Sequence, residues 1–384
     1  MSPLRIGINA IFRGKPTGVA NYVIHLVNEI SRIDHENEYF VFVTDHNNFW
    51  FTKDNPNFHY IVCSVNPARP ILRRLWELTV FPGIVNKHNL HIMHFPTNIL
   101  PAFIKCPSIV TFVDCQYFHQ PSQNNLLRRY FNKVFMRLSA HRAEAILTIS
   151  NSVKDDVLRY LGAKEENIYT THLGQDFSGV PRDEKQIESL RQKLSLTQKY
   201  LLFVGFPQYR KNLVRLTKAF GQACSRLDET IDLVICGDLT HTRDESDYNN
   251  IFKAAVEAGV QDRLKFINYV ERRELHTLIT GAEVLTFPSL YEGFGLPVLE
   301  AMACGTAVMV SDIPVMHEIS GDAGFYVNPY DINNIASGIE TLLKNHELRE
   351  RLSAKGNGIA CRFTWQDMAE KTLMCYKDFA RRSR

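Results

Sequence analysis

The chain has 384 residues, which is long enough for two domains of ordinary size. Hydrophobic residues make up 45% and charged residues 22% of it, proportions typical of a soluble globular protein. The net charge of +3 is too small to indicate nucleic-acid binding, so any basic region has to be judged locally.

Short apolar runs alternate with longer amphipathic segments along the chain. In chain order, strands are predicted over 4–9, 39–44, 58–63, 91–95, 108–113, 145–149, 200–204, 231–236, 263–267, 283–287 and 306–310. Helices are predicted over 18–33, 126–142, 152–161, 212–227, 272–281, 296–304 and 333–345. This alternation predicts an α/β fold of two doubly wound, Rossmann-like domains, each with a parallel sheet covered by helices on both faces.

A domain boundary is predicted near residues 175–198. Residues 178–188 are polar and contain glycine and proline, and a new strand begins at Tyr200. We therefore expect an N-terminal domain over 1–176, a linker over 177–198 and a second domain over 199–364. Ligands of doubly wound domains bind at the carboxyl ends of the strands, so we expect a site in a cleft between the domains.

Cellular location is suggested by the cysteines and by the N-terminus. The eight cysteines form no Cys-x-x-Cys pair and several lie in apolar runs, which predicts buried, reduced thiols in a reducing compartment. The N-terminus reads as a short strand rather than a signal peptide. No stretch reaches the roughly 18–20 apolar residues of a membrane helix, so we expect a cytoplasmic protein whose membrane contact is at most peripheral.

The most informative segment is 287–305, in which a strand is followed by a glycine-containing loop and a helix. Gly293 and Gly295 let the backbone approach a ligand, and Pro297 suits the first turn of a helix. Free N–H groups at that helix start suit a diphosphate. Glu292 and Glu300 frame the loop, and a buried carboxylate at Glu300 requires a partner such as a ribose hydroxyl.

This segment is similar to the Glu-x7-Glu signature of glycosyltransferase family 4, including its Glu-Gly-Phe-Gly-Leu-Pro and Glu-Ala-Met-Ala-Cys-Gly runs. The resemblance implies a GT-B fold, with Glu292 on the donor sugar and Glu300 on the donor ribose. It also implies backbone amides offered to the donor by Gly293, Phe294, Gly295 and Leu296.

Two further loops resemble parts of the same family. The run after the strand at 200–204 contains Gly205, Arg210 and Lys211, and fixed cations there would stabilise a departing nucleoside diphosphate. It looks like the family's Arg-Lys-Asn phosphate-binding loop. The loop around Gly18 resembles the family's N-terminal glycine loop, which closes over the diphosphate. Neither a P-loop nor a Gly-x-Gly-x-x-Gly pattern occurs.

The strand end at 113–114 departs from the family. Relatives usually read His-Asp there, with the histidine near the reacting sugar, whereas this chain has Val113 followed by Asp114. His119 is the candidate imidazole of the same loop. The substitution leaves open whether donor choice is tuned, the rate is lowered or the chain is an inactive homologue.

The resemblance covers nearly the whole chain, including a C-terminal helix at 365–384 that completes the first domain. It implies retaining hexosyl transfer from a nucleotide diphosphate sugar to a glycan or lipid-linked acceptor, in cell-surface polysaccharide or lipopolysaccharide synthesis. GDP-mannose is the preferred donor because the Arg-Lys-Asn form is similar to mannosyltransferases, and UDP-sugars remain open. Base selection is expected from loop 238–247. No Asp-x-Asp triplet is present, which predicts transfer without a metal or other cofactor.

Residues 126–142 are both basic and apolar. Arg129, Lys133 and Arg137 recur at four-residue spacing, while Leu127, Tyr130, Phe131, Val134 and Leu138 form the apolar side. A second cluster consists of Arg69, Arg73, Arg74 and Trp76. Two interpretations stand: a helix packed on the first-domain sheet with a solvated basic edge, or a surface that docks onto anionic lipid headgroups.

Two other functions use the same motifs. A GT-B sugar-nucleotide epimerase would turn over a donor without an acceptor. A catalytically degenerate homologue, suggested by Val113, would bind nucleotide without transferring a sugar.

Overall fold

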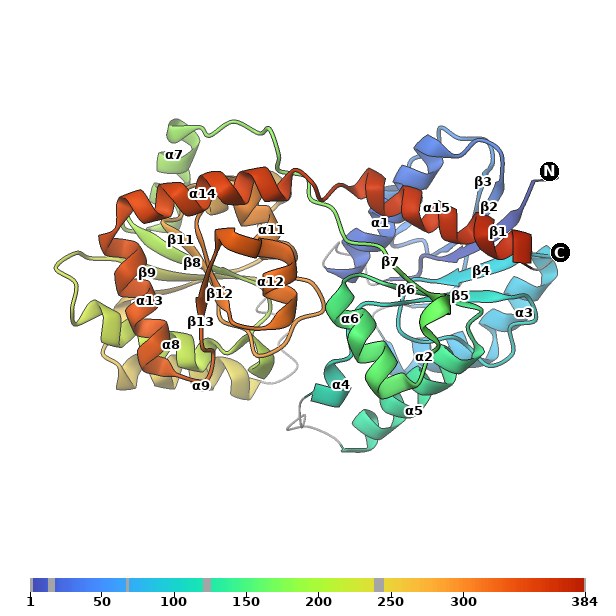
Figure 1. The fold of residues 1–384 in the computed structure, drawn as a ribbon, viewed down its shortest axis with the longest axis horizontal. Coiled ribbons are helices and arrows are strands. Elements are labelled where there is room, and N and C mark those ends of the chain that lie inside the picture. Colours follow the sequence, from blue (N-terminus) through green and yellow to red (C-terminus); the bar gives the residue numbers. More distant parts are fainter. Residues whose placement is uncertain (1–2, 13–17, 67–68, 120–125, 238–244, 383–384) are drawn as a thin grey trace. The chain divides into compact units, whose positions relative to one another are not determined.

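The computed structural model describes residues 3–12, 18–66, 69–119, 126–237 and 245–382. It divides the chain into two compact units, drawn in Figure 1. Unit 1 consists of Met1–Gly174 together with Thr364–Arg384, and unit 2 of Gln175–Phe363.

Within the described residues, unit 1 contains a seven-stranded parallel sheet of order β3-β2-β1-β4-β5-β6-β7. Its strands are β1 (Arg5–Asn9), β2 (Glu38–Val43), β3 (Phe58–Val62), β4 (Ile92–Phe95), β5 (Ser108–Phe112), β6 (Ala145–Thr148) and β7 (Ile168–Thr170). Its helices are α1 (Val19–Ile33), α2 (Pro70–Thr79), α3 (Phe81–Val85), α4 (Gln116–His119), α5 (Leu126–Arg142), α6 (Asn151–Asp156) and α15 (Trp365–Arg382).

The C-terminal helix α15 is fastened to unit 1 by a buried polar chain. It packs on α1, and its Tyr376 hydroxyl lies 2.7 Å from His94 Nδ1. The other ring nitrogen, His94 Nε2, lies 2.7 Å from Thr111 Oγ1, which is 3.0 Å from the Tyr22 hydroxyl. Burial lowers the pKa of His94 to about 3, so the ring is neutral and serves as a hydrogen-bonding spacer between strands and helix.

Unit 2 contains, in its described part, a six-stranded parallel sheet of order β10-β9-β8-β11-β12-β13. Its strands are β8 (Tyr200–Val204), β9 (Asp232–Cys236), β10 (Leu264–Ile267), β11 (Val284–Phe287), β12 (Val308–Ser311) and β13 (Gly324–Val327). Its helices are α7 (Glu184–Leu194), α8 (Leu213–Cys224), α9 (Glu245–Glu257), α10 (Arg272–Thr280), α11 (Leu296–Ala303), α12 (Pro314–Ser320), α13 (Ile332–Lys344) and α14 (His346–Ala360).

The helices of unit 2 form two contacting groups. Helix α8 packs against α9 and α13, whereas α11 packs against α10, α12 and α14. Connections between parallel strands are almost always right-handed, and the strand order changes direction between β8 and β11, so the two groups lie on opposite faces of the sheet, as Figure 1 shows for α8 and α11. The predicted α/β class with two doubly wound domains is therefore confirmed.

Two strands, β7 and β13, were not predicted from the sequence, and both lie at the edge of their sheet. β7 has only three residues, and β13 begins with a glycine. Edge strands are covered less completely than central ones, and β7 and β13 lack the apolar run by which most other strands were recognised. The segment predicted as a linker, 177–198, includes helix α7, which is capped by Asp183 and packs on α10.

None of the eight cysteines, all of which lie in described segments, forms a disulfide; four are buried and Cys361 is exposed. Over the part of the chain that the structure describes, no helix combines the length and apolar character needed to cross a membrane.

Candidate functional site

The predicted donor-site residues of unit 2 gather where the strand order reverses, between the neighbouring strands β8 and β11. The loop after β8 makes a single turn over Tyr209–Lys211, and the Arg210 carbonyl accepts a 2.7 Å hydrogen bond from the Leu290 N–H. Asn212 joins the same loops, because its Nδ2 donates to the carbonyl of Pro288 at 2.9 Å, and it also donates to the carbonyl of Pro329, after the last strand of the sheet, at 2.6 Å. The two loops are therefore fixed to each other before any ligand is bound.

A buried charge triad, Lys211–Glu292–Arg210, connects these loops. Lys211 Nζ lies 2.7 Å from Glu292 Oε1, and Arg210 Nη1 lies 2.8 Å from Glu292 Oε2. The side chains of Lys211 and Glu292 are only 9% and 8% exposed. Each carboxylate oxygen thus accepts from a different cation, and the triad carries one net positive charge in a water-poor position.

The pKa values of the triad follow from burial and pairing. Burial lowers the pKa of Lys211 to about 8, with Glu292 opposing the shift and Arg210 adding to it. Burial alone would raise the pKa of Glu292, but Arg210 and Lys211 outweigh it and hold that pKa below its usual range. Glu292 is therefore ionised, and its charge in turn keeps Lys211 protonated near neutral pH.

Helix α11 begins directly beyond the triad. Gly295 precedes it with φ of 122°, and a Cβ there would lie 2.9 Å from Met316 Cε, so the position requires glycine. Pro297 lies in the first turn, where its missing N–H costs nothing. Gly293 and Phe294 are buried and Leu296 is partly exposed. The helix start offers N–H groups and a partial positive charge to an anion.

Gly205 follows strand β8 with φ of 145°, and its backbone lies beside the Lys211 side chain. A Cβ on Gly205 would meet Lys211 Cε at 3.7 Å. The positive φ explains why glycine stands there, and it leads the chain from the strand into the loop of the triad.

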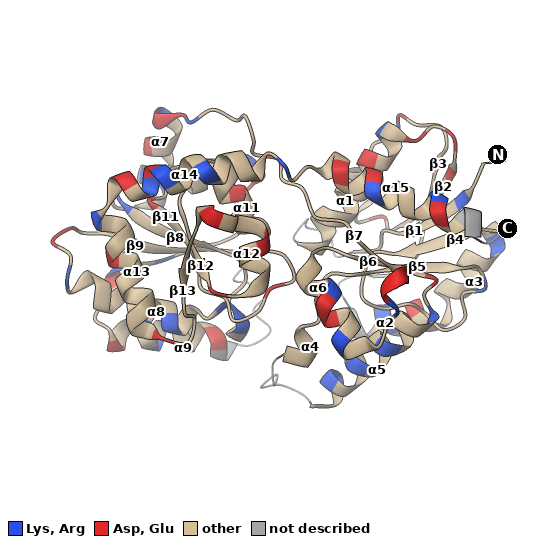
Figure 2. Ribbon diagram, viewed as in Figure 1, with Lys and Arg blue, Asp and Glu red and all other residues tan. Residues whose placement is uncertain are grey.

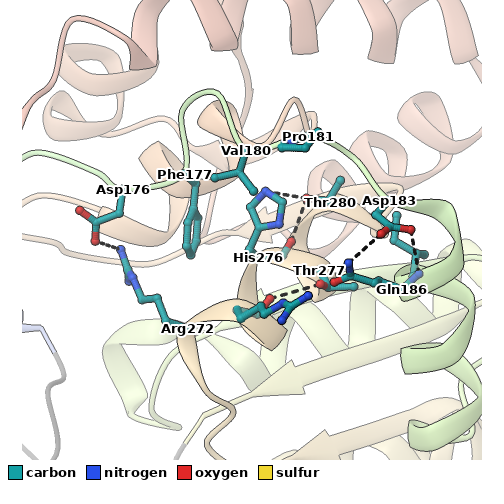
Figure 3. Close-up of a pocket in the computed structure, with 12 residues that line it drawn as sticks. Asp176, Phe177, Val180, Pro181, Asp183, Gln186, Arg272, His276, Thr277 and Thr280 are labelled. Atoms are coloured by element: carbon teal, nitrogen blue, oxygen red, sulfur yellow. Dashed lines mark hydrogen bonds and ion pairs between the residues drawn. The ribbon is translucent and has the colours of Figure 1, made fainter.

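Glu300 is 5% exposed, and its expected partner is a hydroxyl of the donor ribose. The structure supplies a partner from the protein: Arg272 Nη1 lies 2.7 Å from Glu300 Oε1. Arg272 Nη2 also lies 2.6 Å from Asp176 Oδ2, and the guanidinium is 4.5 Å from the Phe177 ring centroid. Figure 3 shows Arg272 reaching Asp176 alongside Phe177.

Arg272 was not predicted from the sequence. It stands between Glu271 and Arg273 at the start of α10, a charged run that is typical of a solvated helix end. Its place after strand β10 was the available signal, because loops after parallel strands converge at the ligand edge of the sheet.

A cavity of about 490 Å³ lies beside Arg272, between α10 and residues 176–187. Phe177 and His276 meet edge to face on its wall, with ring centroids 5.2 Å apart (Figure 3). Burial lowers the pKa of His276, so its ring is neutral at physiological pH.

Replacing Arg272 with methionine should weaken both stability and nucleotide binding. Glu300 would remain buried without its cation, at a cost of about 1–2 kcal/mol because Arg272 itself is partly exposed. The loss of orientation at Glu300 should raise the Kd of a nucleoside diphosphate about tenfold. Urea unfolding and calorimetric titration measure the two effects. Arg273→Met, at an exposed neighbouring position of α10, is the matched control and should change neither.

The predicted residues of unit 1 lie on two segments, one before α1 and one after β5. Gly18 precedes α1 with φ of 46°, and residues 13–17 of its loop fall outside the described residues. Asp114 follows β5, where its carbonyl accepts from Asn98 Nδ2 at 3.1 Å. His119, at the end of α4, places Nε2 2.7 Å from Asp156 Oδ1. Contacts of Asp114 and His119 with a sugar stay predictions, as does base selection by loop 238–247, most of which is not described.

Two family models together match most of the chain. Residues 185–358 match Glycosyl transferases group 1, and residues 16–178 match Glycosyltransferase Family 4. O-antigen chain mannosyltransferase B of Escherichia coli is 29% identical over 289 residues, 75% of this chain and 74% of that protein. Serotype-specific mannosyltransferase WbdA of Escherichia coli is 28% identical over 252 residues, 65% of this chain but only 30% of that protein.

The fold recurs in solved structures. The crystal structure of Anabaena Alr3699/HepE in complex with UDP-glucose superposes with a TM-score of 0.78, at 17% identity, over 98% of this chain and all of that one. A likeness at this identity shows the fold alone, and it agrees with the two parallel sheets described above. The chain therefore belongs to the group 1 and family 4 glycosyltransferases, has the GT-B fold and is a hexosyltransferase.

Proposed function

We propose that this chain transfers a mannosyl residue from GDP-mannose, with retention of configuration, to a glycan or lipid-linked acceptor during synthesis of a cell-surface polysaccharide of the O-antigen type. The observation that carries the donor half of the proposal is the buried Lys211–Glu292–Arg210 triad beside the start of α11. Mannose as the transferred sugar is supported by the relatives named mannosyltransferases, and O-antigen as the product by the name of the first.

The triad accounts for leaving-group stabilisation. As the bond between the sugar C1 and the β-phosphate oxygen breaks, negative charge accumulates on the departing diphosphate. Lys211, Arg210 and the α11 N–H groups are held in place beforehand, so they stabilise that charge without reorganising. The acceptor oxygen bonds to C1 on the same face, and its proton passes to the leaving phosphate oxygen.

Glu292 acts in this proposal as an organiser of charge rather than as a nucleophile. Both of its oxygens are in ion pairs and its pKa is held low, which makes it a weak nucleophile. Neutralisation by Lys211 and Arg210 also supports transfer without a metal ion. Glu300, oriented by Arg272, is assigned to the donor ribose.

A panel of GDP, UDP, ADP and their sugars, scored by thermal unfolding with and without EDTA, tests the donor. GDP-mannose should stabilise the chain most, by about 2.7 kcal/mol at roughly 100 times its Kd, and EDTA should not change the effect. Glu300→Ala should abolish the stabilisation. A larger effect of UDP-glucose, the ligand bound by the Anabaena protein, would replace the proposed donor. No stabilisation by any nucleotide would reject the site. The anomer of the product, read by NMR, tests retention.

A further inference from the structure

Helix α5 turns its apolar side chains to the solvent. Leu127, Tyr130, Phe131 and Leu138 are 69%, 66%, 56% and 51% exposed, and Leu126 before them is 76% exposed. Their spacing along the helix places them on one side. The buried residues of α5 are instead Met136, Ser139 and Ala140. Helix α5 does contact strand β5, as the first interpretation expects, but its large apolar side chains are not buried there and require another explanation.

The same helix carries strong positive charge. Its sequence contains five arginine or lysine residues and no aspartate or glutamate, and Figure 2 shows the basic positions along α5. Lys133 and Arg137 lie 4.9 and 5.4 Å from the Phe118 ring centroid, so the cations are drawn together over one ring. Burial, followed by repulsion from Arg129 and Arg137, lowers the pKa of Lys133. Such crowded cations are stabilised by an external anion.

Helix α2 also combines exposed apolar side chains with positive charge. Leu72 and Leu75 are 53% and 54% exposed. Arg73 and Arg74 share one carboxylate, Glu77, at 3.4 and 3.3 Å, and Arg69 precedes the helix. The charge of Arg128 on α5 is among the causes that lower the pKa of Arg74, after burial, which places the two helices near each other.

We propose that α5 and α2 form a docking surface for an anionic lipid membrane. Lipid meets both requirements at once: apolar side chains enter the headgroup boundary while arginine and lysine pair with lipid phosphates. A nucleic acid would satisfy the cations but leave Leu127 and Phe131 in water. A second copy of the chain would bring two α5 helices of like charge together. The inference is independent of the sugar donor, because it concerns a surface of unit 1 alone.

Flotation of the full chain with phosphatidylcholine vesicles, with and without phosphatidylglycerol, tests the proposal. The protein should bind the vesicles that contain phosphatidylglycerol, and salt should weaken the binding. Leu127→Ser combined with Phe131→Ser should lower partitioning on the order of a hundredfold. Arg128→Gln combined with Arg137→Gln should lower it about thirtyfold.

The matched control is Phe252→Ser combined with Val256→Ser on α9 of unit 2, whose side chains are 48% and 53% exposed, and it should bind vesicles as the parent does. Unchanged thermal unfolding verifies that each variant folds. The proposal is overturned if the parent ignores phosphatidylglycerol, or if all variants bind alike. It is also overturned if sedimentation shows a dimer that Leu127→Ser with Phe131→Ser dissociates while no vesicle binding occurs.

Discussion

Replacing Glu292 with glutamine is expected to lower kcat/KM for hexosyl transfer by about 10²–10³. The amide keeps the shape of the side chain but removes the charge that holds Lys211 and Arg210 in place. Lys211 then remains buried without a counter-ion, so its pKa falls below the present value of about 8 and the ammonium deprotonates near neutral pH. The leaving diphosphate thereby loses one fixed positive charge. Initial rates with labelled donor measure the loss.

Stability should fall in the same variant, because a buried pair that loses one partner typically costs about 3–5 kcal/mol. Adding Lys211→Met to Glu292→Gln removes the unpaired ammonium, so the double variant should regain part of the unfolding free energy and none of the activity. Glu283→Gln is the matched control, since Glu283 forms a partly buried pair with Arg349 (2.8 Å) elsewhere in unit 2. An equal loss of activity in Glu283→Gln would mean that stability, rather than charge at the site, explains the result.

The sequence predicted the position of a strand best where nearly all residues of that strand are buried. The central strands β5, β8 and β11 are almost wholly buried, and their mostly apolar residues allowed them to be located within a residue or two. The edge strands β7 and β13 lacked that pattern. Helix α5 shows another limit of sequence patterns. Helical spacing identified its apolar side but did not indicate whether that side would face protein or solvent.

In the site, likewise, the local backbone conformation could be predicted from the sequence, whereas contacts between residues distant in the chain could not. The loop and helix around Gly295 follow from local rules for glycine, proline and helix starts, so they were readable. The pairing of Lys211 with Glu292 joins residues 81 positions apart, and no local pattern contains it. The partner of Glu300 is also supplied by tertiary structure, from the start of α10. Sequence motifs thus identified Lys211, Glu292 and Glu300 as site residues, whereas their ion-pair partners could be recognised only in the folded structure.

The rate of transfer should decline as the pH rises through about 8. Lys211 has a native pKa of about 8, below its usual 10.5, so it loses its proton in the native state first. The free enzyme then lacks one cation for the diphosphate, and kcat/KM should fall tenfold per pH unit on the alkaline side. A bound diphosphate favours the ammonium, so the corresponding decline in kcat should occur at higher pH. Lys211→Arg, whose guanidinium stays charged, should remove the alkaline decline even if its overall rate is lower.

The pH dependence of stability separates this effect from unfolding. Below pH 8 both the native and the unfolded chain hold the Lys211 proton, and the cost of burying the charge is fully present. Between about 8 and 10.5 the unfolded chain binds more protons at this residue than the native chain does, so the contribution of Lys211 to stability rises with pH. Activity and this contribution therefore change in opposite directions over the same range. A rate that fell in parallel with the unfolding free energy, or an alkaline decline retained in Lys211→Arg, would assign the pH dependence to another group.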